Sequence, residues 1–127
     1  GSGILSVAAA RLGASRVAAV DIDPLAVRIA RENIAVNQVT DVVVAEESPV
    51  PPAGSFDIVV ANILADIILN MAPALFAATA PGGGLLLASG IIDTRAQDVL
   101  SGLTQVGYTD VVITRESEWV CLIARRP

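Results

Sequence analysis

Residues 16–36, RVAAVDIDPLAVRIARENIAV, decide the fold class, because they predict a buried strand that leads directly into a helix. The apolar run 16–22 is typical of a strand covered on both faces. Asp23 and Pro24 follow as a helix N-cap and a first helical residue, and the helix is expected to reach about Val36. This strand–helix unit favours a mostly parallel α/β sheet.

The same alternation continues on either side of this unit. Three more helices are expected: residues 4–12, residues 64–79 with a kink or restart at Pro73, and a helix from a capping box at 94–97 to Gly107. Five more strands are expected at residues 41–45, 56–61, 85–89, 108–115 and 119–125, and a Pro-rich loop at 46–55. The turn between the last two strands is too short for a helical crossover, so they should be antiparallel. The predicted fold class is α/β, with a Rossmann-like, mostly parallel sheet and an antiparallel C-terminal strand pair.

Length and composition limit the functions that the chain can have. It has 127 residues, enough for one domain (1–127), and 54% of them are hydrophobic, which excludes a disordered tail. The net charge of −5 disfavours binding to nucleic-acid backbones and favours a basic partner. The chain has no histidine and one cysteine, Cys121, so we expect no disulfide framework and no metal site. Its apolar runs are too short for a membrane span.

The first residues, Gly1-Ser2-Gly3, open the predicted helix 4–12. Glycines allow a ligand to approach the backbone closely, and a helix N-terminus favours negative charge, so Gly1 and Gly3 are candidate cofactor-binding residues. A flexible chain end, or a remnant of a tag, explains the same residues equally well. The helix that follows is expected to bury one apolar face, which consists of Ile4, Leu5, Ala8 and Leu12.

Two further acidic positions are candidates for nucleoside binding. Asp21 ends the strand 16–22, twenty residues after Gly1, where an acidic residue in a doubly wound sheet commonly accepts hydrogen bonds from ribose hydroxyls. Glu46 and Glu47 follow the strand 41–45, and Glu46 is a candidate acceptor for an adenine amino group. For at least one of the two, a solvated loop charge is the simpler interpretation.

Asn62 ends the apolar strand FDIVVA and precedes the next helix. It has two possible roles of about equal weight: a helix N-cap, or a carbonyl that accepts hydrogen bonds from an amine. Three other conspicuous side chains, Met71, Trp119 and Cys121, are expected to pack in the core.

Five segments together resemble the ribosomal protein L11 methyltransferase family, and they span nearly the whole chain: GSGILSVAAARLGA, VDIDPLAVRIARENIAVNQV, FDIVVANILA, PGGGLLLASGI and SEWVCLIARR. The glycines are common to class I methyltransferases, whereas the combination of VDIDP, ANILA and the late EWV strand is more specific. The resemblance implies a cytoplasmic, S-adenosyl-L-methionine-dependent N-methyltransferase that acts on amino groups of ribosomal protein L11. The net charge and the short apolar runs predict no nucleic-acid or membrane partner.

The resemblance also assigns roles to residues. Gly1 and Gly3 match later glycines of the family's cofactor motif, Asp21 matches the ribose-binding acid, and Asn62 matches the Asn beside the transferring methyl group. The first motif glycine has no counterpart here. We therefore expect a catalytic domain that is incomplete at its N-terminus, without the first strand, which lies in the middle of the family's sheet, and without the substrate-docking domain.

Two other functions are compatible with parts of the sequence. A nicotinamide-dependent oxidoreductase domain would explain Gly1, Gly3 and Asp21, although Ser6 stands where that motif has its third glycine. A non-catalytic, methyltransferase-like scaffold would explain the incomplete glycine motif. Binding of S-adenosylhomocysteine, of NAD or of neither distinguishes the three.

Overall fold

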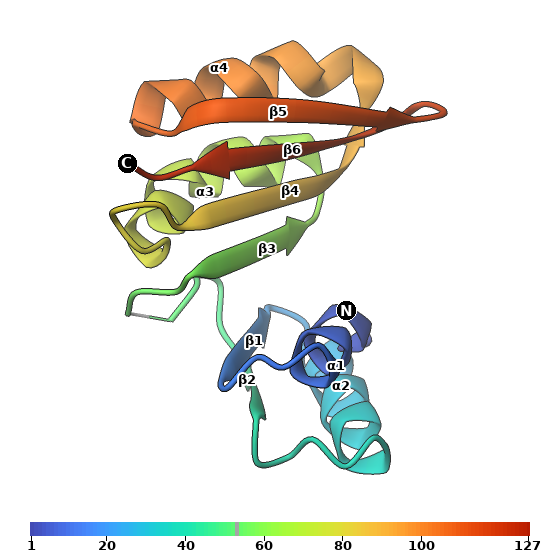
Figure 1. Ribbon diagram of the computed structural model, residues 1–127. Helices are drawn as coiled ribbons and strands as arrows, with labels where there is room; N and C mark the ends of the chain where they lie inside the picture. Colours follow the sequence, from blue (N-terminus) through green and yellow to red (C-terminus); the bar gives the residue numbers. More distant parts are fainter. Residues whose placement is uncertain (53) are drawn as a thin grey trace. The chain divides into compact units, whose positions relative to one another are not determined.

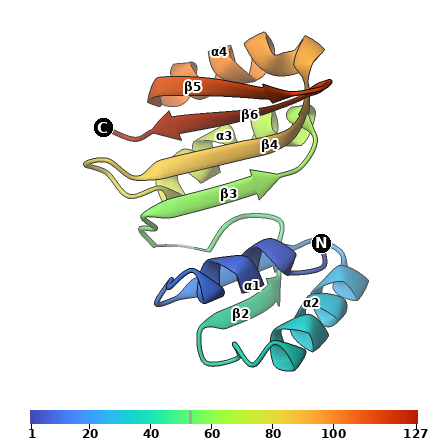
Figure 2. The same cartoon turned by 45° about the vertical axis from the view of Figure 1, so that its right-hand side comes forward.

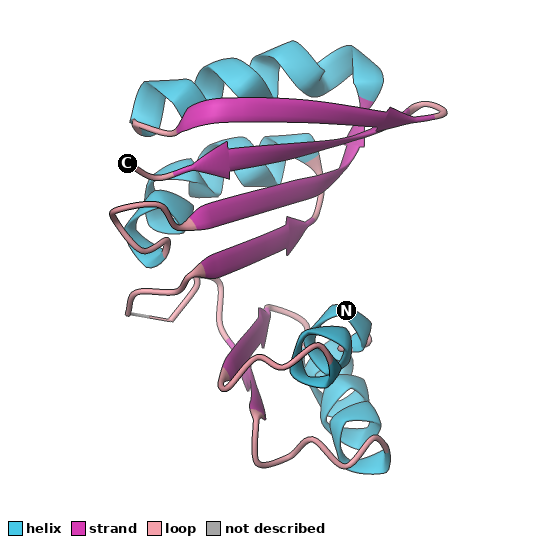
Figure 3. Cartoon of the chain, in the orientation of Figure 1, coloured by secondary structure: helices cyan, strands magenta, loops and turns pink. Residues whose placement is uncertain are grey.

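In the computed structural model, which describes residues 1–52 and 54–127, the strands form two separately hydrogen-bonded sheets (Figure 1). The chain divides between them into two units, Gly1–Pro52 and Ala53–Pro127. Ala53, within the predicted loop 46–55, lies outside the described residues. Each unit contains strands and helices in alternation, as predicted (Figure 3).

The first unit has two parallel strands and two helices. Its elements in chain order are α1 (Ile4–Arg11), β1 (Val17–Asp21), α2 (Pro24–Val36) and β2 (Val43–Glu47). Helix α2 begins as predicted, because the Asp23 carboxylate accepts a hydrogen bond of 2.9 Å from the Leu25 backbone N–H. Val27, Ala30 and Ile34 form its buried stripe, and they share a small core with Val43 and Ala45 of β2.

Helix α1 turns a different face to this core from the one predicted. Leu12, just past its end, is 88% exposed, and Ile4 is 71% exposed, whereas Val7 and Ala10 pack against the core. Six of its eight residues, ILSVAAAR, are apolar, so the periodicity of its residues could not select the buried face.

The second unit is a four-stranded sheet with strand order β3-β4-β6-β5. Its elements are β3 (Ile58–Asn62), α3 (Ala65–Ala78), β4 (Leu85–Ile92), the short 3-10 helix η1 (Asp93–Arg95), α4 (Ala96–Val106), β5 (Thr109–Glu116) and β6 (Trp119–Arg125). Strands β3 and β4 are parallel, and β6 is antiparallel to both β4 and β5, which confirms the predicted C-terminal pair. Helices α3 and α4 lie on the same face of this sheet (Figures 1 and 2). The core between the sheet and these helices includes Ile68, Leu86, Val99, Leu103 and Leu122.

The two helices of this unit differ in part from the prediction. Helix α3 continues through Pro73, so it does not restart there. Helix α4 follows η1 directly, and its N-cap is Arg95 rather than Thr94, so the predicted capping box does not start it. The Arg95 guanidinium instead binds the carboxylates of Asp66, at 2.7 Å, and Asp98, at 2.9 Å. The predicted end of α4 is confirmed at Gly107, which has a left-handed backbone (φ 116°).

A buried polar cluster joins the end of α3 to the C-terminal residues. Thr79 Oγ1 donates to the Leu75 carbonyl, and the hydroxyl groups of Thr79 and Tyr108 lie 2.8 Å apart. The Arg126 guanidinium donates to the carbonyls of Phe76 and Thr79, both at 2.7 Å, and stacks over the Phe76 ring. These bonds satisfy carbonyl groups that the end of a helix leaves without partners.

Tyr108 should titrate above the ordinary range of tyrosine. Burial raises the pKa of its phenol, and this outweighs the opposing effects of the Thr79 hydrogen bond and the Arg126 charge. Because Tyr108 is the single tyrosine in the sequence, near-ultraviolet absorbance reports its ionisation alone. The midpoint should lie above ~10 in the native protein and return to about 10 in denaturant. A raised native pKa favours the neutral form, so the contribution of Tyr108 to stability should be constant below about pH 10 and should be lost as the pH rises through the native midpoint.

Tyr108→Phe should reduce the free energy of unfolding by about 1 kcal/mol, because it removes one buried hydrogen bond and keeps the ring. The Thr79 hydroxyl keeps its bond to Leu75 in this variant. Urea denaturation, with the exposed Ser101→Ala as a control, measures the difference. Equal stability of the Tyr108 and Ser101 variants would contradict this account of the cluster.

Candidate functional site

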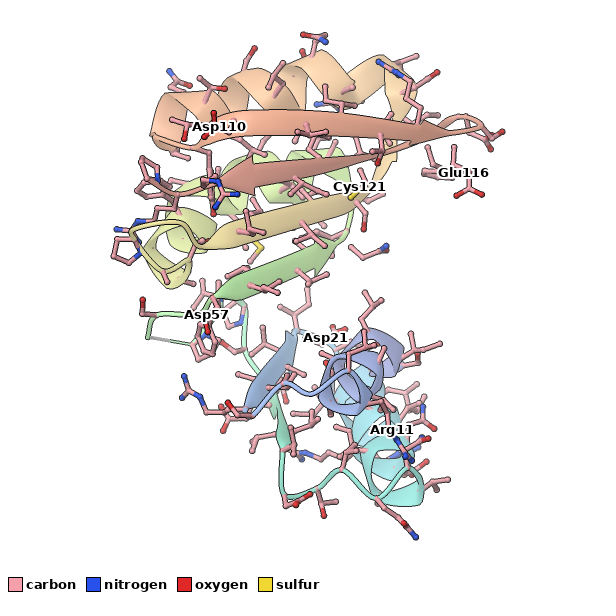
Figure 4. All side chains as sticks on the ribbon, in the orientation of Figure 1. Arg11, Asp21, Asp57, Asp110, Glu116 and Cys121 are labelled. Atoms are coloured by element: carbon pink, nitrogen blue, oxygen red, sulfur yellow. The ribbon has the colours of Figure 1, made fainter. Side chains whose placement is uncertain are left out.

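Asp21 is the last residue of β1, at the carboxyl end of the parallel pair (Figure 4). Its Oδ2 accepts a hydrogen bond from the Gly1 amino group, and its Oδ1 accepts one of 3.0 Å from the Asp23 backbone N–H. These two bonds, the first with the larger effect, lower the pKa of the Asp21 carboxyl group. Asp21 is therefore an anionic acceptor at the edge where open α/β sheets bind their ligands.

The structure brings the predicted glycine segment to the same place. Gly3 precedes α1 with φ 83°, a conformation that favours glycine, and a Cβ at Gly3 would lie 3.1 Å from the Cβ of Ala30. A Cβ at Gly1 would meet no atom within 4 Å in the described structure. The glycine at position 3 is therefore explained by structure, because a side chain there would crowd α2. Gly1 has no such neighbour and lies in open space beside Asp21.

Glu46 does not lie in the loop that the sequence predicted. Strand β2 begins and ends two residues later than expected, so Glu46 pairs with Val20 and Glu47 pairs with Asp21. Because successive side chains of a strand point to opposite faces, Glu47 shares a face with Asp21 and Glu46 lies on the other face. The sequence alone did not favour Glu47 over Glu46 as a ligand-binding residue. That choice depends on which of the two shares a face with Asp21, and hence on the exact bounds and register of the strand.

Asn62 is the last residue of β3, in the second unit, and it does not cap the next helix. The N-cap of α3 is Leu64, which excludes the structural alternative for Asn62. Its Nδ2 donates a hydrogen bond of 2.9 Å to Ser89 Oγ, on the neighbouring strand β4. Gly90 follows with φ 76°, and a Cβ there would lie 3.2 Å from Asn62 Oδ1.

Asn62, Ser89 and Gly90 form one side of an open pocket of about 560 Å³ within the second unit. The hairpin of β5 and β6 forms the other side, and its contributions include Thr114, Arg115, Glu116, Trp119 and Cys121. Figure 4 labels Glu116 and Cys121 on these strands. The pocket offers a carboxamide, a carboxylate and an indole ring, which are groups that accept N–H donors or contact cations.

Trp119 and Cys121 were predicted to lie in the core, and this is wrong for both. Trp119 is half exposed, Cys121 is partly buried, and both line the pocket. The alternate residues of β6, Val120, Leu122 and Ala124, are the ones that face the helices. Burial raises the pKa of the Cys121 thiol, which disfavours the reactive thiolate.

Within residues 1–52 and 54–127, no group of three or more metal-binding side chains is close enough together to hold a metal ion. None of the helices in this described part is long and apolar enough to span a membrane.

Comparison with known proteins gives a consistent result over the whole sequence. The family model described as "Ribosomal protein L11 methyltransferase (PrmA)" matches residues 1–127. The ribosomal protein L11 methyltransferase of Heliobacterium modesticaldum is 45% identical over 99% of this chain and 40% of that protein, and that of Geobacter metallireducens is 49% identical over 97% and 40%. The chain thus spans about 40% of the length of these curated relatives.

Solved structures show the same relationship. The ribosomal protein L11 methylase of Lactobacillus delbrueckii subsp. bulgaricus has a TM-score of 0.91 and 32% identity, with 100% of this chain and 66% of that chain covered. A SAM-dependent O-methyltransferase of Thermotoga maritima has a TM-score of 0.87 at 14% identity, with 99% and 56% covered, which shows the shared fold alone. The predicted α/β, class I methyltransferase fold is confirmed, and the chain belongs to the ribosomal protein L11 methyltransferase family.

Proposed function

We propose that the protein to which this chain belongs transfers methyl groups from S-adenosyl-L-methionine to amino groups of ribosomal protein L11. The family match over residues 1–127 supports this activity. The observation that carries it in the structure is Asn62, a carboxamide held by Ser89 at the carboxyl end of a parallel strand and facing an open pocket. An oxidoreductase domain is not favoured, since the family model and the relatives named above are those of ribosomal protein L11 methyltransferases.

The residues proposed to bind the cofactor are Gly1, Gly3, Asp21 and Glu46 in the first unit and Asn62 in the second unit. The donor set suits a nucleoside with a positive charge: Asp21 is an anionic acceptor for ribose hydroxyls, and Gly3 leaves the first turn of α1 without a side-chain cap. Glu47 is a second candidate beside Glu46, because it lies on the same face as Asp21. When bound, the cofactor would supply an activated methyl group on a sulfonium.

The acceptor amine must be neutral to react, although a lysine ammonium group has a pKa of about 10.4 in water. Desolvation and a nearby positive charge both lower this pKa. The chain has neither histidine nor lysine to act as a conventional base, so its contribution would be alignment of the reacting groups. Asn62 would orient the cofactor and the amine, with its carbonyl oxygen as the acceptor of an N–H group.

The proposed partner is ribosomal protein L11, a basic substrate that suits the net charge of −5. The same charge disfavours direct binding to nucleic acid, and we propose that the protein acts in the cytoplasm without a membrane partner.

Isothermal titration of the full-length protein should detect S-adenosylhomocysteine binding and little or no NAD binding. Asp21→Asn should weaken this binding by about tenfold, because it removes a hydrogen bond to a charged acceptor. Asp41→Asn, at an exposed position of the same unit, is the matched control. Tighter binding of NAD than of S-adenosylhomocysteine would favour the oxidoreductase, and binding of neither would favour a scaffold.

Asn62→Ala in the full-length protein should reduce kcat for methyl transfer about 100-fold while the melting temperature stays within a few degrees. A large effect on kcat is expected because alignment of the reacting groups has a strong influence on rate. Little change in stability is expected because the Asn62 side chain is exposed. Asn70→Ala, on the exposed face of α3, is the control. Transfer of methyl groups to ribosomal protein L11 is measured with labelled cofactor, and wild-type activity in the Asn62 variant would refute the role.

A further inference from the structure

We infer that Ser89 is a positioning residue for Asn62, and that Gly90 leaves the space in which the Asn62 carbonyl lies. This inference rests on the proposed function, because the position of the Asn62 carboxamide matters for methyl transfer only if Asn62 acts in it. It gives a role to two residues of β4, Ser89 and Gly90, that lie in the segment PGGGLLLASGI but to which the resemblance assigned none.

The backbone brings Ser89 to Asn62. Strands β3 and β4 are parallel, and their register pairs Asn62 with Ser89 at the last step of the ladder. The Ile63 backbone N–H donates to the Ser89 carbonyl at 3.2 Å, so the two strand ends remain joined beyond β3. In parallel strands, residues in register lie on the same face, and the two side chains are therefore neighbours.

The hydrogen bond between the two side chains sets the direction of the carboxamide. Asn62 Nδ2 donates to Ser89 Oγ at 2.9 Å. A carboxamide is planar, so with its nitrogen held by Ser89 its oxygen points away from the hydroxyl group and remains available as an acceptor. Asn62 is exposed, and it lacks the packing that would hold a buried side chain in one rotamer.

Gly90 provides the space on the carbonyl side. A Cβ at Gly90 would lie 3.2 Å from Asn62 Oδ1 and 3.3 Å from the Ile63 backbone nitrogen, and the φ of 76° disfavours any side chain. The register of β4 with β6 shifts between Ala88 and Ile91, which places Ser89 and Gly90 in an irregularity of the strand. Such irregularities are frequent next to active sites, where they redirect a side chain.

A double-mutant cycle in the full-length protein tests the inference. Ser89→Ala should reduce kcat about tenfold and leave the S-adenosylhomocysteine Kd within about twofold, because Asn62 is proposed to act beside the transferring methyl group, which S-adenosylhomocysteine lacks. Ser89→Thr keeps the hydroxyl group and should restore most of the activity. In an Asn62→Ala background, Ser89→Ala should have no further effect, which a general loss of structure would not reproduce. Ser101→Ala, on the exposed face of α4, is the control.

A second measurement does not depend on activity. The side-chain NH₂ resonances of Asn62 in nitrogen-15 NMR spectra should show faster hydrogen exchange in Ser89→Ala than in the wild type. Unchanged exchange, or equal kcat in the Ser89→Ala and wild-type proteins, would overturn the inference. If the wild type bound S-adenosylhomocysteine but methylated no amine, the proposed function would fail, and the exchange rates would still decide whether Ser89 holds the carboxamide.

Discussion

The parallel pairing of β3 with β4 is the constraint on which the candidate site of the second unit depends. This ladder ends with Asn62 opposite Ser89, so a backbone register produces a hydrogen bond between two side chains that are 27 residues apart in sequence. The pairing is maintained by the core behind it, where Leu86 and Ala88 of β4 are fully buried under α3 and α4. A slip of one residue would turn these apolar side chains to the other face and would separate Asn62 from Ser89.

The opposite wall of the pocket is positioned by different interactions. Strand β6 lies between β4 and β5 and is antiparallel to both, and its half-exposed Trp119 and partly buried Cys121 line the same pocket as Asn62. The end of this strand is attached to α3 by Arg126, whose guanidinium binds carbonyls at the helix terminus. Packing, helix capping and the arrangement of the pocket are thus parts of one connected structure within the second unit.

The two candidate regions provide different chemistry. In the first unit, Asp21 is an anionic carboxylate with a lowered pKa, placed beside the start of α1. In the second unit, the pocket provides a neutral carboxamide beside a carboxylate and an aromatic ring. Neither region contains a histidine or lysine, since the sequence has none. Such a set of groups suits binding and alignment of a charged nucleoside and an amine better than proton transfer by a strong base.

The sequence by itself determined the order of helices and strands, the α/β class, the antiparallel C-terminal pair and the family, because these follow from local periodicity, turn length and residue motifs. It also proposed Asp21 and Asn62 as candidate site residues, since polar residues that end apolar strands are conspicuous in the sequence. Tertiary structure decided the buried face of α1, the exposure of Trp119 and the N-cap of α4 at Arg95. It also decided that Glu47 rather than Glu46 shares a face with Asp21, and that Ser89 contacts Asn62. The physical reason is that these properties depend on register and on partners distant in the chain, to which local patterns are insensitive.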